Sequence, residues 1–127
     1  MIVIDASVAV AALLNAGPAR RAIVGDQLHV PHLIDSEIAN ALRRNEINAR
    51  IGAASARLAV DAWRRLGVIR YPVIGLIERV WQLRGNLTAY DASYVALAES
   101  LDCALLTCDG RLAGTPRLRC PITVLSG

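Results

Sequence analysis

Short apolar runs that end in an acid alternate with helix-forming segments along the chain. The run "MIVID" ends at Asp5, and "CALLTCD" ends at Asp109. "LHVP", "VIRYPV" and "ITVL" are further short extended segments. Parallel strands that are buried on both faces have this apolar character and require helical crossovers between them. The sequence therefore predicts an α/β fold, a three-layer α/β/α sandwich around a central parallel sheet.

Helical periodicity and helix-end signals locate the segments between these strands. We expect helices at about residues 7–15, 33–45, 51–66, 75–83 and 88–100, and a loop or short helix in "GRLAG". The apolar stripes expected to face the core are Ile34, Ile38, Ala41 and Leu42 in the second helix, Leu58, Ala59, Ala62 and Leu66 in the third, and Tyr90, Tyr94, Leu97 and Leu101 in the last.

Length and composition limit the class of protein. A chain of 127 residues is expected to form a single domain, residues 1–127. A hydrophobic content of 54% excludes disorder. The apolar runs are shorter than the ~20 residues that cross a bilayer, so no membrane association is expected. The three cysteines, Cys103, Cys108 and Cys120, lack zinc-site spacing and predict reduced, buried thiols in a cytoplasmic protein.

Four acids are expected at the same edge of the predicted sheet. Asp5 and Asp109 end strands, while Glu37 and Asp91 lie early in helices that could start from that edge. Each also has a local explanation. Asp5 could cap a helix, Asp91 could form a capping box with Thr88, Asp109 could begin an Asp-Gly turn, and Glu37 suits a helix's first turn.

Taken together, the four acids indicate a metal site. Four carboxylates in one crevice repel one another unless cations neutralise them. Oxygen ligands without a histidine or cysteine cluster favour Mg²⁺ or Mn²⁺, which activate water in phosphodiester cleavage. The chain has 14 arginines, no lysine and 11 carboxylates, and without the four acids the balance is 14 against 7, or +7. An acidic site within a basic surface is typical of a nuclease.

Four segments in this order resemble the PIN-domain ribonucleases, especially the VapC toxins of bacterial VapBC toxin–antitoxin modules. They are "VIDASVAVAALL", "SEIANALRR", "TAYDASYVALAES" and "LLTCDGRLA". The resemblance covers nearly the whole chain, although residues 48–83 match only in length and helical character. It implies a metal-dependent endoribonuclease that acts as a toxin and leaves a 5′-phosphate and a 3′-hydroxyl.

The resemblance also assigns the site residues and partners. The acids are Asp5, Glu37, Asp91 and Asp109, which are expected to bind Mg²⁺, or Mn²⁺ in its place, and to act in catalysis; Thr107 supports them through a hydrogen bond. The expected partners are an RNA substrate, a VapB-like antitoxin and a second copy of the chain in a homodimer, with higher toxin–antitoxin assemblies.

Other residues carry weaker expectations. Arg43 and Arg44 share the helix of Glu37 and are candidates for RNA phosphate contacts. His29 and His32 lack the G-x-S-x-G of a serine hydrolase and are expected to be structural or exposed. Most of the Trp and Tyr side chains are expected in core or subunit packing rather than stacked on bases.

Two alternatives to a nuclease stay open on the residues alone. The first is a PIN-like module that binds RNA or protein without cutting, which the loss of one acid would favour. The second is a phosphohydrolase or receiver-type domain that uses Asp5 or another strand-end acid as a phosphoryl acceptor. Ser7 stands where a dehalogenase-type enzyme has its second acid, and the chain has no lysine for a receiver.

Overall fold

The computed structural model describes residues 1–126 and contains a five-stranded, wholly parallel sheet. The strands follow the order β3-β2-β1-β4-β5 across the sheet. Their bounds are β1 (Ile2–Ile4), β2 (Leu28–Pro31), β3 (Val68–Tyr71), β4 (Leu105–Thr107) and β5 (Ile122–Val124). The predicted fold class is confirmed. The expectation of a single domain extends to Gly127, which lies outside the described residues, and stays a prediction.

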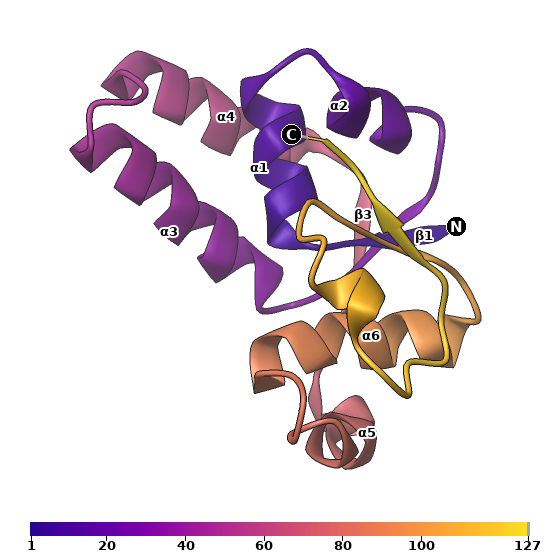
Figure 1. Ribbon diagram of the computed structural model, residues 1–127. Coiled ribbons are helices and arrows are strands. Elements are labelled where there is room, and N and C mark those ends of the chain that lie inside the picture. The colour runs from indigo at the N-terminus through magenta and orange to yellow at the C-terminus, as the bar shows by residue number, and fades with distance from the viewer. Residues whose placement is uncertain (127) are drawn as a thin grey trace.

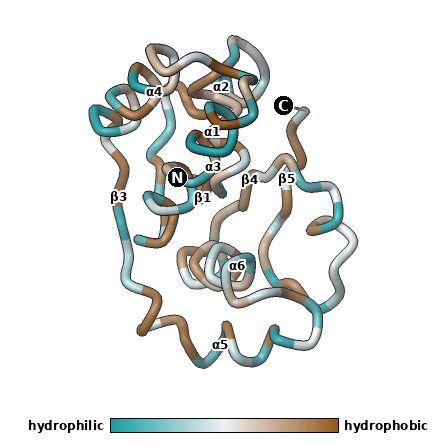
Figure 2. The backbone as a smooth tube through the Cα atoms, turned by 90° about the vertical axis from the view of Figure 1, so that its left-hand side faces the viewer, coloured by the Kyte–Doolittle hydropathy of each residue, from teal (hydrophilic) through white to brown (hydrophobic). Residues whose placement is uncertain are grey.

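Helices cover both faces of the sheet (Figure 1). They are α1 (Ala6–Leu14), α2 (Pro18–Ile23), α3 (Ile34–Ile47), α4 (Ala53–Arg65), α5 (Ile77–Gln82) and α6 (Ala89–Leu101), with short 3-10 turns η1 (Ile74–Leu76) and η2 (Leu112–Gly114). Figure 2 shows α1 to α4 on one side of the strands and α5 and α6 on the other. None of the described helices is long and apolar enough to cross a membrane.

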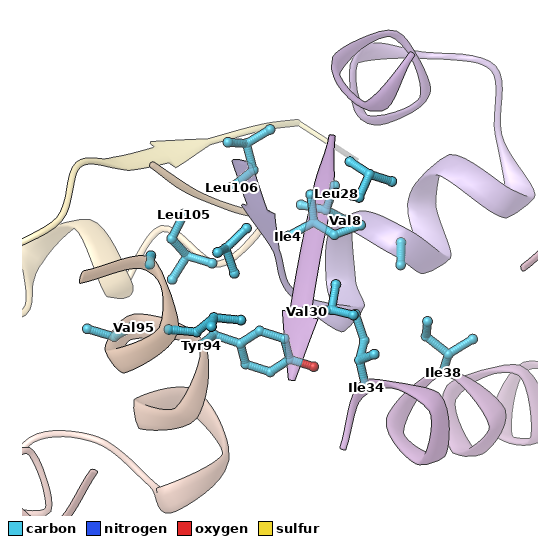
Figure 3. Close-up of a cluster of buried hydrophobic side chains, with 14 of the residues drawn as sticks. Ile4, Val8, Leu28, Val30, Ile34, Ile38, Tyr94, Val95, Leu105 and Leu106 are labelled. Atoms are coloured by element: carbon cyan, nitrogen blue, oxygen red, sulfur yellow. The ribbon is translucent and has the colours of Figure 1, made fainter. Parts of the chain in front are cut away.

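The core lies between the sheet and the helices (Figure 3). Strand residues Val3, Ile4, Val30 and Leu105 are fully buried because both faces of the sheet are covered. The central strands β1 and β4 therefore read as nearly continuous apolar runs, without alternation. This property made them recognisable in the sequence.

Helix α6 is buried on all sides over Ala92–Ala98, between the sheet and α5. An all-round buried helix has no polar face, so its periodicity is weak. The predicted stripe was therefore partly wrong: Tyr94 and Leu97 are buried, but Tyr90 is 65% exposed. Thr88 caps the helix as predicted, because its hydroxyl accepts a hydrogen bond from the backbone N–H of Asp91 at 3.2 Å.

Two further expectations were incomplete or wrong. No helix was expected at α2, although Pro18 occupies its first position, where the missing backbone N–H of proline costs nothing. In α4, Ala59 and Trp63 are the buried residues, whereas Leu58 is 69% exposed. The helix is rotated relative to the predicted stripe because Trp63 packs inward.

Candidate active site

The strand order creates a crevice at the carboxyl end of β1. The chain leaves β1 toward β2 on one side, while β4 lies on the other side of β1. In open α/β sheets such a switch in direction leaves a crevice in which ligands bind. Asp5 directly follows β1, and Asp109 lies two residues after β4. The sheet therefore brings these two acids to one place, although 104 positions separate them in the sequence.

Asp5 is held by hydrogen bonds to both carboxylate oxygens. Its Oδ1 accepts from the backbone N–H of Val8 at 3.1 Å and from the Ser7 hydroxyl at 2.5 Å. Its Oδ2 accepts from the hydroxyl of Thr107 at 2.5 Å. Asp5 thus caps α1, as predicted, and is also tied to β4. With only 8% of the residue exposed, the carboxylate has little freedom to turn.

Thr107 links two of the acids. It is fully buried at the end of β4, and besides donating to Asp5 its hydroxyl accepts a hydrogen bond from the backbone N–H of Asp109 at 3.0 Å. Ser7 acts in a similar way from α1, since its hydroxyl accepts from the backbone N–H of Cys108 at 2.9 Å. The side-chain hydroxyls of Thr107 and Ser7 therefore connect the ends of β1 and β4 through hydrogen bonds.

Glu37 reaches the site from the first turn of α3. The buried hydroxyl of Tyr94 donates a hydrogen bond to its Oε1 at 2.5 Å. Figure 3 shows the Tyr94 ring among core side chains, with its hydroxyl directed toward the side on which Ile34 lies. Burial raises the pKa of Glu37, the Tyr94 hydroxyl lowers it in part, and the charges of Asp91 and Asp5 raise it further.

Asp91 reaches the site from the first turn of α6. Burial raises the pKa of its carboxyl, and the negative charges of Asp5 and Asp109 act in the same direction. In the described residues no hydrogen bond to this carboxylate is formed; only its backbone N–H takes part in the helix cap. The Asp91 carboxylate is therefore available to bind a ligand.

Asp109 is paired with a cation, unlike the other three acids. Arg111 donates from Nε to Oδ1 at 3.0 Å and from Nη2 to Oδ2 at 2.8 Å. The Arg111 backbone N–H donates to the same Oδ1 at 3.0 Å. The side-chain contact of Arg111 is the main reason that the pKa of Asp109 lies below its ordinary value.

The four predicted acids line one hollow of about 200 Å³ together with Ala6, Ser7 and Tyr94. Within residues 1–126, no three side chains of the metal-binding types already stand close enough to hold an ion. The donor set nevertheless fits a hard cation, because it consists of carboxylate oxygens, and burial with mutual repulsion raises the pKa of Glu37 and Asp91.

The two predicted arginines lie differently. Arg44 lines a second hollow, of about 320 Å³, which shares Ala6, Ser7 and Glu37 with the acidic one. Arg43 is exposed one residue earlier on α3 and does not line either hollow. Of these two arginines, Arg44 therefore lies beside the acids and Arg43 does not.

The histidines and aromatic residues lie mostly outside the site. His29 is buried, with Nδ1 2.6 Å from the hydroxyl of Tyr71, and His32 is exposed. Trp63 is buried, whereas Trp81 is 66% exposed. The cysteines are free but only partly buried, which corrects the expectation of buried thiols.

Three residues of the site were missed in the sequence analysis. Ser7 and Arg111 each lie two positions after an acid, at a spacing that suits local hydrogen bonds to the carboxylate. That spacing could have indicated them. Tyr94 was assigned to the apolar stripe of its helix, and no local signal marks its hydroxyl, because its partner Glu37 is 57 residues away.

The chain is therefore a parallel α/β/α sandwich that carries a cluster of carboxylates at the point where the strand order reverses direction. A family model described as "PIN domain" matches residues 2–118. Ribonuclease VapC9 of Mycobacterium tuberculosis (strain H37Rv) is 62% identical over 125 residues, covering 98% of both chains. The chain belongs to the PIN-domain family and, within it, to the VapC ribonucleases.

Further relatives agree with this placement. Ribonuclease VapC1 of M. tuberculosis H37Rv is 44% identical over 97% of this chain and 96% of its own. The crystal structure of PAE2754 from Pyrobaculum aerophilum has a TM-score of 0.71 at 28% identity, covering 97% of this chain and 83% of that one. M. tuberculosis VapC20, described as a sarcin-ricin loop cleaving toxin, has a TM-score of 0.65 at 22% identity, covering 94% and 99%. At that identity VapC20 supports the fold alone.

Proposed function

We propose that this protein is the endoribonuclease toxin of a toxin–antitoxin module and hydrolyses RNA phosphodiester bonds with Mg²⁺ or Mn²⁺. The observation that carries the proposal is the meeting of Asp5, Glu37, Asp91 and Asp109 in one hollow at the strand switch. The full-length similarity to proteins named VapC ribonucleases supports the same activity.

The residues divide into those that would bind the ion and those that orient them. Asp5, Asp91 and Asp109 would hold the metal, and Glu37 would complete the site or orient the attacking water. A bound divalent ion supplies an activated water and stabilises the leaving oxygen. Thr107 and Ser7 fix Asp5, and Tyr94 fixes Glu37. Water attack would leave a 5′-phosphate and a 3′-hydroxyl.

The partners follow from the VapC relationship. We propose that the protein acts in the cytoplasm, forms a homodimer and higher toxin–antitoxin assemblies, and is inhibited by a VapB-like antitoxin. Exposed apolar side chains such as Ile74, Ile77 and Trp81 on η1 and α5 leave surface available for such contacts.

The two alternatives to a nuclease have less support. All four acids line the hollow, and hydroxyl side chains orient two of the carboxylates, an arrangement that simple RNA binding does not require. An aspartyl-phosphate enzyme would use one nucleophilic acid, whereas here Asp5 is bound at both oxygens.

The test is cleavage of a labelled total RNA sample by the purified protein. Cleavage is expected with Mg²⁺ or Mn²⁺ and none in EDTA. Asp5→Asn and Asp91→Asn are expected to lower the rate at least ~100-fold, the scale for a group that acts directly in catalysis. Asp61→Asn is the matched control, because Asp61 pairs with Arg57 on α4, away from the hollow. Equal cleavage by all variants, or none by the wild type, would overturn the proposal.

A further inference from the structure

Arg111 makes a close contact that contributes little to stability. Its guanidinium donates to both oxygens of Asp109, yet 89% of the Arg111 side chain is exposed. Exposed ion pairs contribute little to stability, because water and salt screen both charges. The local turn is also held independently by the Arg111 backbone N–H, which donates to the Asp109 carboxylate. The arginine side chain can therefore leave Asp109 at small cost.

The Asp109 carboxylate cannot bind Arg111 and a metal ion equally well at the same time. Both carboxylate oxygens already accept hydrogen bonds from the guanidinium. A divalent cation at the same oxygens would compete for their lone pairs and repel the positive charge of Arg111. The proposed cofactor and the arginine are therefore competitors for one carboxylate.

Arg111 also lines a hollow next to the acidic one. This hollow of about 240 Å³ shares Asp91 and Asp109 with the acidic one, and its other lining groups include Asn86, Thr88 and Thr115. Arg111 is the only cationic side chain among its lining residues in the described chain. Arg44 lines a different neighbouring hollow, which shares Glu37 with the acidic one. Each of these two neighbouring hollows therefore shares acids with the acidic one and has one arginine in its lining.

We infer that Arg111 is an exchangeable arginine, which binds Asp109 when no ion is bound and turns to a phosphate of the RNA strand when the metal takes that carboxylate. This inference rests on the proposed function, because it requires both a metal and RNA at the acids. It assigns the hollow around Asn86, Arg111 and Thr115 as a phosphate-binding site for the substrate strand. A planar guanidinium suits this exchange, since it binds carboxylate and phosphate in the same bidentate way.

The exchange predicts two effects of opposite sign for Arg111→Ala. Mn²⁺ binding, measured by calorimetry without RNA, is expected to tighten about two- to fivefold, because a surface competitor is removed. Binding of a short fluorescent single-stranded RNA of mixed sequence, measured in Ca²⁺ on ice with the probe checked for intactness, is expected to weaken. The slope of log affinity against log salt concentration should fall by ~0.7, the value for one phosphate contact to a single strand.

Arg43→Ala is the matched control, because it removes the same charge from an exposed position outside the hollows. General electrostatics would change both variants alike. The inference is overturned if Arg111→Ala equals Arg43→Ala in either Mn²⁺ affinity or RNA salt slope. RNA cleavage by the wild-type protein is scored separately, so a failed exchange and a failed nuclease assignment are distinguishable.

Discussion

At the scale of single residues, the acids combine a structural and a chemical task. Asp5 caps α1 with one oxygen and is fixed by Thr107 through the other. Asp91 contributes its backbone N–H to the cap of α6 and leaves its carboxylate in the hollow. The local and functional explanations of these residues are therefore compatible, because different atoms of one residue carry them.

The raised pKa of Asp91 predicts that its charge destabilises the folded protein. A carboxyl whose folded pKa lies above its unfolded value loses folding stability as the pH rises from the ordinary pKa of 3.8 through the folded pKa. Asp91→Asn is therefore expected to raise the thermal unfolding midpoint at pH 7 in EDTA. The gain should shrink as the pH falls toward 4, where the wild-type carboxyl becomes protonated.

Asp35→Asn provides a control of opposite sign. Arg70 holds the pKa of Asp35 below its ordinary value, so this charge stabilises the fold above the unfolded pKa, and the contribution is lost as the pH falls through the folded pKa. The variant should melt below the wild type at pH 7. If Asp91→Asn also melts lower at pH 7, the inference that the Asp91 charge destabilises the fold fails.

At the scale of elements, α6 has the central place in the fold. It contacts β1, β2, β4 and α5, and its middle is buried all round. A helix of this kind depends on packing for most of its stability, but its first turn also positions Asp91. The start of α6 therefore affects both the stability of the helix and the position of the Asp91 carboxylate.

Removal of the Thr88 cap is expected to cost stability more than activity. Thr88→Ala removes the acceptor for the Asp91 N–H and should lower the free energy of unfolding by about 1 kcal/mol, measured by urea denaturation. Thr88→Ser keeps the hydroxyl and should stay close to the wild type. Below its melting range, Thr88→Ala should retain most of its RNA cleavage. A loss of cleavage as large as that of Asp91→Asn would mean that the cap itself sets the site.

At the scale of the whole molecule, the sheet order brings the functional groups together. The acids come from the ends of β1 and β4 and the starts of α3 and α6, which converge only because β1 lies between β2 and β4. The neighbouring hollow, which shares Glu37 with the acidic one, is lined along α3 as far as Arg44. Arg44 follows Glu37 by seven residues, or about 10 Å along the helix axis. A bound strand would therefore continue past the acids toward Arg44.

The two neighbouring arginines of α3 should differ in their effect on RNA. Arg44→Ala is expected to weaken binding of a single-stranded RNA and to lower the salt slope by ~0.7, because one phosphate contact is lost. Arg43→Ala should leave the slope unchanged, because Arg43 does not line the hollow. Fluorescence anisotropy over a salt series measures both. Equal slopes for the two variants would show that the strand does not follow this path.

The sequence by itself determined the type of each element and the identity of the acids. Apolar runs such as "MIVI" and "ALLT" become strands buried on both faces, and the acids that follow them lie at one edge of a parallel sheet. Local rules also determined the Thr88 cap. These features depend on neighbours a few residues apart, so periodicity and spacing are sufficient to predict them.

Only the tertiary structure decided which side chains meet. The contact of Tyr94 with Glu37 joins residues 57 positions apart, and that of Thr107 with Asp5 joins residues 102 positions apart. It also decided that Arg44 rather than Arg43 lines the hollow and that α6 is buried on every side. Such contacts follow from strand order and helix packing, which local periodicity does not encode.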